Sequence, residues 1–255
     1  MRQPSDSPTL NPDRLAETCR GLADRVATRF PGRGLARHAA WFADYAARVI
    51  AAGPQNISAP IGFRLVSWIG CVVTTCLLFS PLFFVRRLDG LDQLPVFLSS
   101  LDAMLTVLAA TVGGVFTMRS IEHSVVRRRA LAGLHTLRSF AHVTDMLQTN
   151  KSPTRLLFPG SDADAAEPVP PLKDDAASLS QYLTFCSELY ALTAKVAAFY
   201  GEWTSDAVVL ANVDDIEDLC NGLEGKTTQK LLLLEQLNQR VLRPSTRPPD
   251  QAARG

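Results

Sequence analysis

LPVFLSSLDAMLTVLAATVGGVFTM, residues 94–118, sets the architecture of this chain. It contains one charged residue, Asp102, and is uncharged from Ala103 onward. At about 1.5 Å per residue, a helix of this length exceeds the roughly 30 Å thickness of the hydrocarbon core of a bilayer. We therefore expect a membrane span over residues 94–118.

A second uncharged stretch, LVSWIGCVVTTCLLFSPLFFV, lies upstream at residues 65–85. Its length also matches the bilayer. The connection RRLDGLDQ, residues 86–93, is short and contains Asp and Gly residues that are typical of turns. The sequence thus predicts a transmembrane two-helix hairpin within residues 61–118.

The orientation of the hairpin follows from the basic residues near its ends. Arg48 and Arg64 precede the first span, and Arg86 and Arg87 lie in the connection. The largest basic group follows the second span and is also expected at the lipid surface: Arg119, Arg127, Arg128 and Arg129. This pattern predicts a multi-pass protein of the cell inner membrane with both termini cytoplasmic.

The composition of the chain bears on its class. The 255 residues carry a formal net charge of +1, which does not favour a nucleic-acid partner. The residues at 1–20 include no apolar signal-peptide core, so no cleavable signal is expected. The five cysteines form no CxxC pair, which favours reduced thiols over a disulfide framework or a zinc site.

Two amphipathic helices are expected before the hairpin, within residues 13–60. Asn11 or Asp13 would cap the first helix, which runs through Arg29. The second helix, over residues 34–52, carries aromatic and basic residues that fit either anionic lipid or a C-terminal domain. Its His38 is expected in solvent, and residues 1–12 are expected to be disordered.

The remainder of the chain also shows helical patterning. Residues 119–149 continue the second span, and a Pro-rich acidic linker follows at residues 150–175. Apolar residues three and four apart predict a cytoplasmic helical bundle over residues 176–242, with a break or kink allowed at Gly222 and Gly225. Residues 243–255 are expected to be a disordered tail. The predicted fold class is all-α.

One polar stripe stands out within LHTLRSFAHVTDM, residues 134–146. The spacings of three, four and three residues place four of its side chains on one helix face. We expect them to form a polar network with carboxylates of another helix, the alternative being a solvated face. The residues of this candidate network are His135, Arg138, His142, Asp145, Glu188, Asp214, Asp215, Glu217 and Asp218.

An enzyme is a weaker interpretation of the same residues. His135 and His142 are seven residues apart, about 10 Å along a helix, so both cannot bind one ion. A metal-dependent enzyme using His142, Asp145 and the acidic helix is kept as an alternative. The chain has no nucleophile elbow, phosphate-binding loop or dinucleotide fingerprint. We therefore expect no catalytic residue, cofactor or metal.

Two features of the second span allow a further alternative, an oligomeric channel or transport component. Asp102 is an intramembrane carboxylate, although its position near the connection suggests the interface. Ala109 with Gly113, and Ala110 with Gly114, are spaced for close helix packing. That packing serves either the hairpin itself or a homo-oligomer.

The stretches LHTLRSFAHVTDM, YLTFCSELYALTAKVAAFY and VDDIEDLCNGLEGKTTQK resemble an uncharacterised family of bacterial two-span inner-membrane proteins. The resemblance covers roughly the C-terminal half and implies a bacterial inner membrane without implying an activity. Together these observations predict a membrane-anchored helical interaction module that contacts lipid and binds or organises a protein partner.

Overall fold

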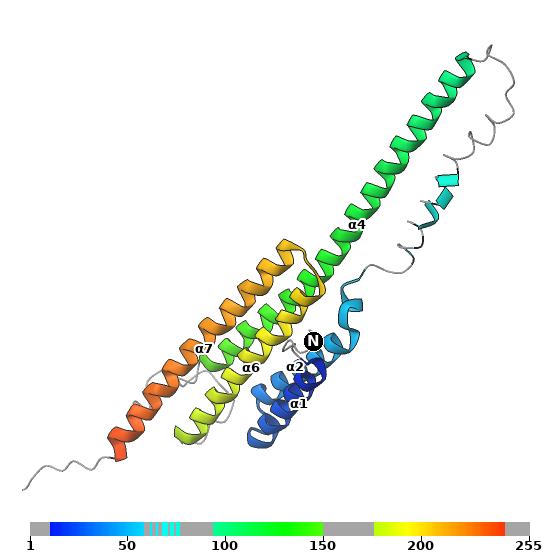
Figure 1. Cartoon of the computed structure of the whole chain (residues 1–255). Helices are drawn as coiled ribbons and strands as arrows, with labels where there is room; N and C mark the ends of the chain where they lie inside the picture. Colours follow the sequence, from blue (N-terminus) through cyan, green and yellow to red (C-terminus); the bar gives the residue numbers. More distant parts are fainter. Residues whose placement is uncertain are drawn as a thin grey trace, which may run out of the picture. The chain divides into compact units, whose positions relative to one another are not determined.

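The computed structural model describes residues 11–58, 94–149 and 176–242, with residues 62, 65, 68–70, 72–73 and 75–76. Every regular element in these residues is helical, which confirms the all-α class (Figure 1). The linker predicted at 150–175, the tail at 243–255, most of the span at 65–85 and its connection lie outside the described residues. The elements are α1 (Pro12–Arg29), α2 (Gly34–Ala52), the 3₁₀ turn η1 (Gly53–Asn56), α4 (Leu94–Thr149), α6 (Ala176–Trp203) and α7 (Ala207–Leu242).

The chain divides into two compact units. The bundle unit comprises residues 1–53 and 133–255, and the second unit comprises residues 54–132. Helices α1 and α2, which the sequence placed in a region of their own, belong to the bundle unit, where α1 packs against both α2 and α6. The ring of Phe30 explains this union, because its edge contacts with Tyr182 and Phe185 join the N-terminal hairpin to α6.

The predicted ends of α1 and α2 are confirmed. The Asn11 side chain accepts a hydrogen bond from the amide of Arg14 at 3.2 Å and caps α1. Gly32, with φ of 73°, supplies the left-handed conformation that the turn between the two helices requires. Both helices then bury one face, which in α2 includes Leu35, Phe42 and Val49.

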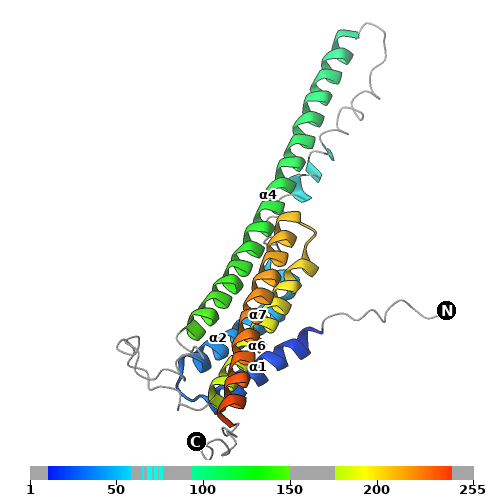
Figure 2. The ribbon, with the colours of Figure 1, turned by 90° about the vertical axis from the view of Figure 1, so that its left-hand side faces the viewer.

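Helices α6 and α7 lie side by side (Figure 2). The Asp206 carboxylate caps α7 by accepting from the amides of Val208 and Val209. The break allowed at Gly222 and Gly225 is wrong, because α7 is continuous through both. One buried stripe holds the helix on either side of these glycines: Val213, Ile216, Cys220, Leu223, Thr227 and Leu234.

Three buried tyrosines of α6 fix its position in the bundle unit. The hydroxyl of Tyr182 donates to the carbonyl of Leu147, and the hydroxyl of Tyr190 accepts from Gln148 Nε2 at 3.1 Å. The hydroxyl of Tyr200 lies 3.3 Å from that of Tyr45 on α2. Because buried hydroxyls need partners, these contacts select one register of α6.

Gln148 also ties α4 to α7. Its Oε1 lies 3.1 Å from the hydroxyl of Thr227, and the side chains of both residues are almost completely buried. The amide of Gln148 therefore bridges α6 and α7 with its two ends. Burying this polar group is tolerated because its donor and its acceptor are both used.

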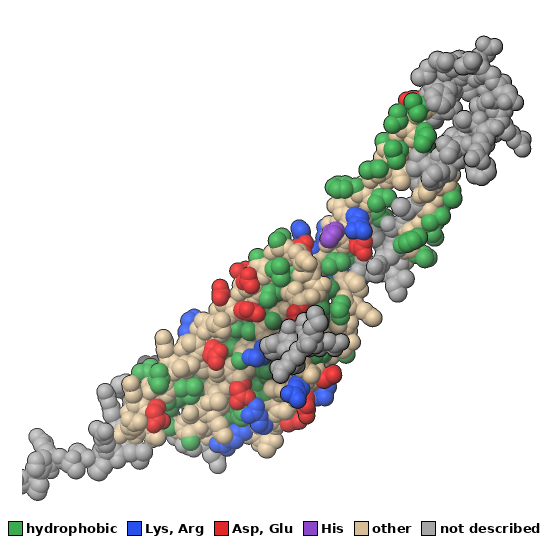
Figure 3. All heavy atoms as spheres, viewed as in Figure 1, with side chains coloured by type: hydrophobic (Ala, Val, Ile, Leu, Met, Phe, Trp, Pro, Cys, Tyr) green, Lys and Arg blue, Asp and Glu red, His purple; other side chains and the backbone are tan. Residues whose placement is uncertain are grey.

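The part of α4 in the second unit has a different surface. Its apolar side chains are exposed, and Figure 3 shows hydrophobic side chains gathered over this length. Within the described residues, α4 is the one helix whose length and composition suit a membrane crossing, with a mean hydropathy of 1.5 over a window that is 0% buried. The exposed residues include Leu101, Met104, Leu105, Leu108, Val112, Val115, Phe116 and Ile121.

Three threonine hydroxyls on this length of α4 are satisfied within the helix. Thr106, Thr111 and Thr117 donate to the carbonyls of Asp102, Val107 and Gly113 at 3.0, 2.6 and 2.8 Å. Each bond runs from a residue to the carbonyl four positions earlier. A hydroxyl that donates in this way needs no further hydrogen-bond acceptor outside the helix.

Gly133 predicts the effect of a minimal substitution in the bundle unit. A Cβ atom at this position would lie 2.2 Å from the hydroxyl oxygen and 2.6 Å from Cζ of Tyr200. Gly133→Ala should therefore lower the free energy of unfolding by about 1–3 kcal/mol, although alanine favours helix. Urea unfolding followed by circular dichroism measures this loss.

Gly225→Ala is the matched control, because no atom lies within 4 Å of the added Cβ. In the middle of the continuous α7 it should raise stability by about 0.5–1 kcal/mol. Equal effects of the two substitutions would contradict the close approach of Tyr200 to Gly133.

Candidate functional site

The polar stripe of α4 meets the acidic part of α7 at one ion pair. Arg138 Nη2 lies 3.4 Å from Asp215 Oδ2, and their side chains are 39% and 62% exposed. His135 and His142 are exposed, and Asp145 is partly exposed. An ion pair in this setting contributes little to stability, so the stripe is largely a surface.

The remaining carboxylates of the candidate network lie elsewhere. Glu188 pairs with Arg25 of α1, so its expected contact with the α4 stripe is replaced by one between α1 and α6. Asp214 and Asp218 are exposed, and Glu217 is partly exposed. Among the described residues, no three His, Cys, Asp or Glu side chains group as a metal site would require.

The thiols of the bundle unit are buried. Burial raises the pKa of Cys19 to about 11 and that of Cys220 to about 12, and Glu217 and Glu224 add to the rise at Cys220. These two thiols are therefore protonated near neutral pH and are poor nucleophiles. Cys186 is buried as well, whereas Cys76 is exposed.

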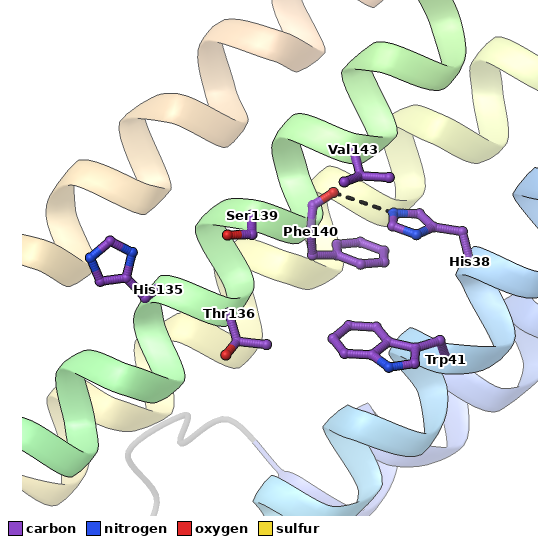
Figure 4. A pocket seen from close by; sticks show the side chains of 7 residues that line it. All are labelled: His38, Trp41, His135, Thr136, Ser139, Phe140 and Val143. Carbon is purple, nitrogen blue, oxygen red and sulfur yellow. Dashed lines mark hydrogen bonds between the residues drawn. The ribbon is translucent and has the colours of Figure 1, made fainter.

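A groove with a volume of about 530 Å³ lies between α2 and α4 in the bundle unit. Helix α2 contributes two side chains and α4 contributes five (Figure 4). The volume lies within the range of ordinary ligand and peptide sites. The lining residues are His38, Trp41, His135, Thr136, Ser139, Phe140 and Val143.

Stacked rings form the wall of this groove. The ring of His38 lies flat on Phe140, with 4.0 Å between centroids and 6° between planes. Trp41 stacks near the same ring at 5.9 Å and on Tyr45 at 5.3 Å. Phe42 packs against Phe140 at 4.6 Å from the core side. Rigid aromatic surface of this kind is typical of sites where a partner is bound.

His38 is not solvated as the sequence suggested. Its Nε2 lies 3.0 Å from the hydroxyl of Thr144. The same atom lies 3.3 Å from the carbonyl oxygen of Phe140 (Figure 4). Burial lowers the pKa of His38, and the hydrogen bond to Phe140 partly offsets that effect. The neutral ring is therefore the native form, and it links α2 to α4.

The rim of the groove is apolar and basic. Of the lining residues, Trp41 and Val143 are 44% and 38% exposed. On α2, Arg37 and Arg48 are exposed at a spacing that puts them along one helix edge, with the exposed carboxylate of Asp44 between them.

The sequence alone did not reveal this groove. The aromatic residues of α2 were visible, and docking of α2 onto the C-terminal domain was one of two open interpretations. The sequence does not show which helix packs against each face of α2. Phe140 lies about 100 residues from His38, and helical periodicity does not say which helices pack together. A cluster of aromatic residues around one histidine was the available signal.

The membrane-related residues all lie in the second unit. Asp102 is exposed, and no atom lies within 4 Å of a Cβ built on Gly113 or Gly114. Arg119, Arg127, Arg128 and Arg129 are exposed on α4. Arg129 also donates to the carbonyl of Ser58.

Comparisons with known proteins add no assignment: no protein-family model, no curated protein and no solved structure matches this chain.

The lowered pKa of His38 predicts how stability depends on pH. In the unfolded chain the pKa of His38 has its ordinary value of 6.5, so the unfolded chain binds a proton more readily than the native protein does. Stability is therefore complete above pH 6.5 and falls as the pH drops below that value. Tm should therefore fall as the pH is lowered from 7.5 to 5.5.

His38→Gln retains a hydrogen-bond donor without titrating and should reduce the fall of Tm between pH 7.5 and 5.5. His135→Gln at the exposed rim is the matched control and should leave the fall unchanged. If both variants behave like the native protein, His38 does not carry the dependence.

Proposed function

We propose that this chain is a bacterial inner-membrane protein with a two-span hairpin, whose cytoplasmic helical bundle binds a protein partner. One observation carries the proposal: α4 has exposed apolar side chains from Leu101 to Ile121 and a one-sided buried face from Leu134 to Gln148. A helix that is apolar and uncovered is costly in water but stable in lipid. The same helix then supplies part of the core of the bundle.

The first apolar stretch supports the hairpin. Its described residues are helical, and Leu65, Trp68, Ile69, Val72 and Val73 are exposed. The arginines that follow the second span favour cytoplasmic termini. The resemblance to bacterial two-span proteins agrees with this location.

The groove between α2 and α4 supports the binding role. Exposed Trp41 and Val143 offer an apolar surface that water leaves favourably on binding. The basic edges favour a partner of opposite charge. The occupant that fits is an amphipathic helix of a protein partner, with apolar residues three and four apart and acidic residues beside them.

Membrane insertion is tested by carbonate extraction and reporter fusions. We expect the protein to stay in the membrane pellet at alkaline pH. Alkaline phosphatase should be inactive when fused at either terminus and active when inserted within residues 86–93, because the enzyme works only outside the cytoplasm. Release by carbonate would contradict insertion, and active terminal fusions would reverse the orientation.

The groove is tested by a photo-crosslinking residue at Ser139, with Thr184 on α6 as an equally exposed control. We expect a crosslinked peptide at Ser139 that has the acidic amphipathic pattern. Trp41→Ala with Val143→Ser should reduce its yield at least tenfold. A peptide from this same chain would show a second copy as the occupant, and a peptide without acidic residues would contradict the proposed partner.

A further inference from the structure

Four exposed arginines follow the apolar length of α4 within residues 119–129, and we call them the arginine collar: Arg119, Arg127, Arg128 and Arg129. The same interval contains one acidic residue, Glu122, so four positive charges and one negative charge leave a net charge of +3 with His123 neutral. Positive charge beside an apolar surface matches a bilayer with anionic headgroups, in which negative charge borders the hydrocarbon core.

The directions of the collar side chains bear on whether they bind lipid headgroups around the helix or a macromolecule on one of its faces. Successive residues of an α-helix project about 100° apart, so Arg127, Arg128 and Arg129 spread over about 200° of the circumference of α4 within about 3 Å of its length. A protein or a nucleic acid docks on one face of a helix. Lipid headgroups surround a helix that leaves the membrane.

The neighbouring chain lies at the same level. Arg129 donates to the carbonyl of Ser58, which lies shortly before the exposed Leu65 and Trp68. On α4, the exposed Ile121 lies between Arg119 and the other three arginines of the collar. The collar therefore marks the level near which exposed apolar side chains of both segments begin.

The direction of the side chains brings the guanidinium groups closer to that level. In an α-helix the Cα–Cβ bonds tilt toward the N-terminus. The N-terminal side of the collar on α4 is its apolar side, so the arginines lean back toward the residues before Ile121. Ile121 and Arg128 are about 10 Å apart along the axis, whereas the headgroup layer of one leaflet is roughly 5–7 Å thick. Long flexible side chains close this difference.

We propose that the arginine collar binds the phosphates of anionic lipid headgroups, a role that rests on the proposed insertion of α4. The guanidinium group forms paired hydrogen bonds with phosphate oxygens and keeps its charge at any physiological pH. An anionic headgroup retains its negative charge beside the collar, whereas a zwitterionic headgroup carries its own ammonium. The collar thus selects the lipids next to α4.

The test is native mass spectrometry of the full chain in neutral detergent, titrated with phosphatidylglycerol, phosphatidylcholine or inorganic phosphate. Each basic residue at a membrane surface strengthens binding about fivefold. We expect phosphatidylglycerol to bind at least tenfold more tightly than phosphatidylcholine. The variant Arg127→Gln, Arg128→Gln, Arg129→Gln should lose that preference and keep its weak binding of phosphatidylcholine.

A charge-matched control carries Arg14→Gln, Arg20→Gln and Lys226→Gln at exposed positions of α1 and α7 and should bind like the native chain. Equal binding of the two lipids, or an unchanged preference in the collar variant, would overturn the proposal. Displacement of lipid by inorganic phosphate would show a site for the free anion. Carbonate extraction of the same proteins separates the two failures: a chain that stays inserted without lipid preference refutes the collar alone.

Discussion

The continuity of α4 is the constraint on which the rest of the structure depends. Its 56 residues form one helix, so the backbone of the apolar length satisfies its own hydrogen bonds before any other segment packs. The same helix presents Leu134, Leu137 and Ala141 to the bundle core. One element thus presents exposed apolar side chains along one length and a one-sided buried face along the other.

Polar contacts give the bundle its register. Apolar helix faces can slide or rotate with modest loss, whereas Gln148 meets Tyr190 and Thr227 in one arrangement only. His38 has the same effect between α2 and α4 through Thr144. The close approach of Tyr200 to Gly133 adds a steric limit, because a larger residue has no room there.

Much of the fold follows from local signals in the sequence. Asn11 and Gly32 define α1 and the turn after it because capping and left-handed turns are decided by neighbouring residues. Contacts between distant segments did not follow. Periodicity placed Glu188 on a helix face, but it could not show that Glu188 pairs with Arg25 while Arg138 pairs with Asp215. The break that Gly222 and Gly225 allowed in α7 is not present, because burial on both sides of these glycines outweighs the flexibility of glycine.

The threonines of α4 have a consequence for motion. Since Thr106, Thr111 and Thr117 donate to carbonyls of their own helix, rotation of that length about its long axis breaks none of these bonds. At the other end, Gln148 anchors the same helix against two neighbours and resists rotation. Rotation of α4 about its long axis is therefore opposed chiefly by the contacts of its C-terminal part in the bundle unit.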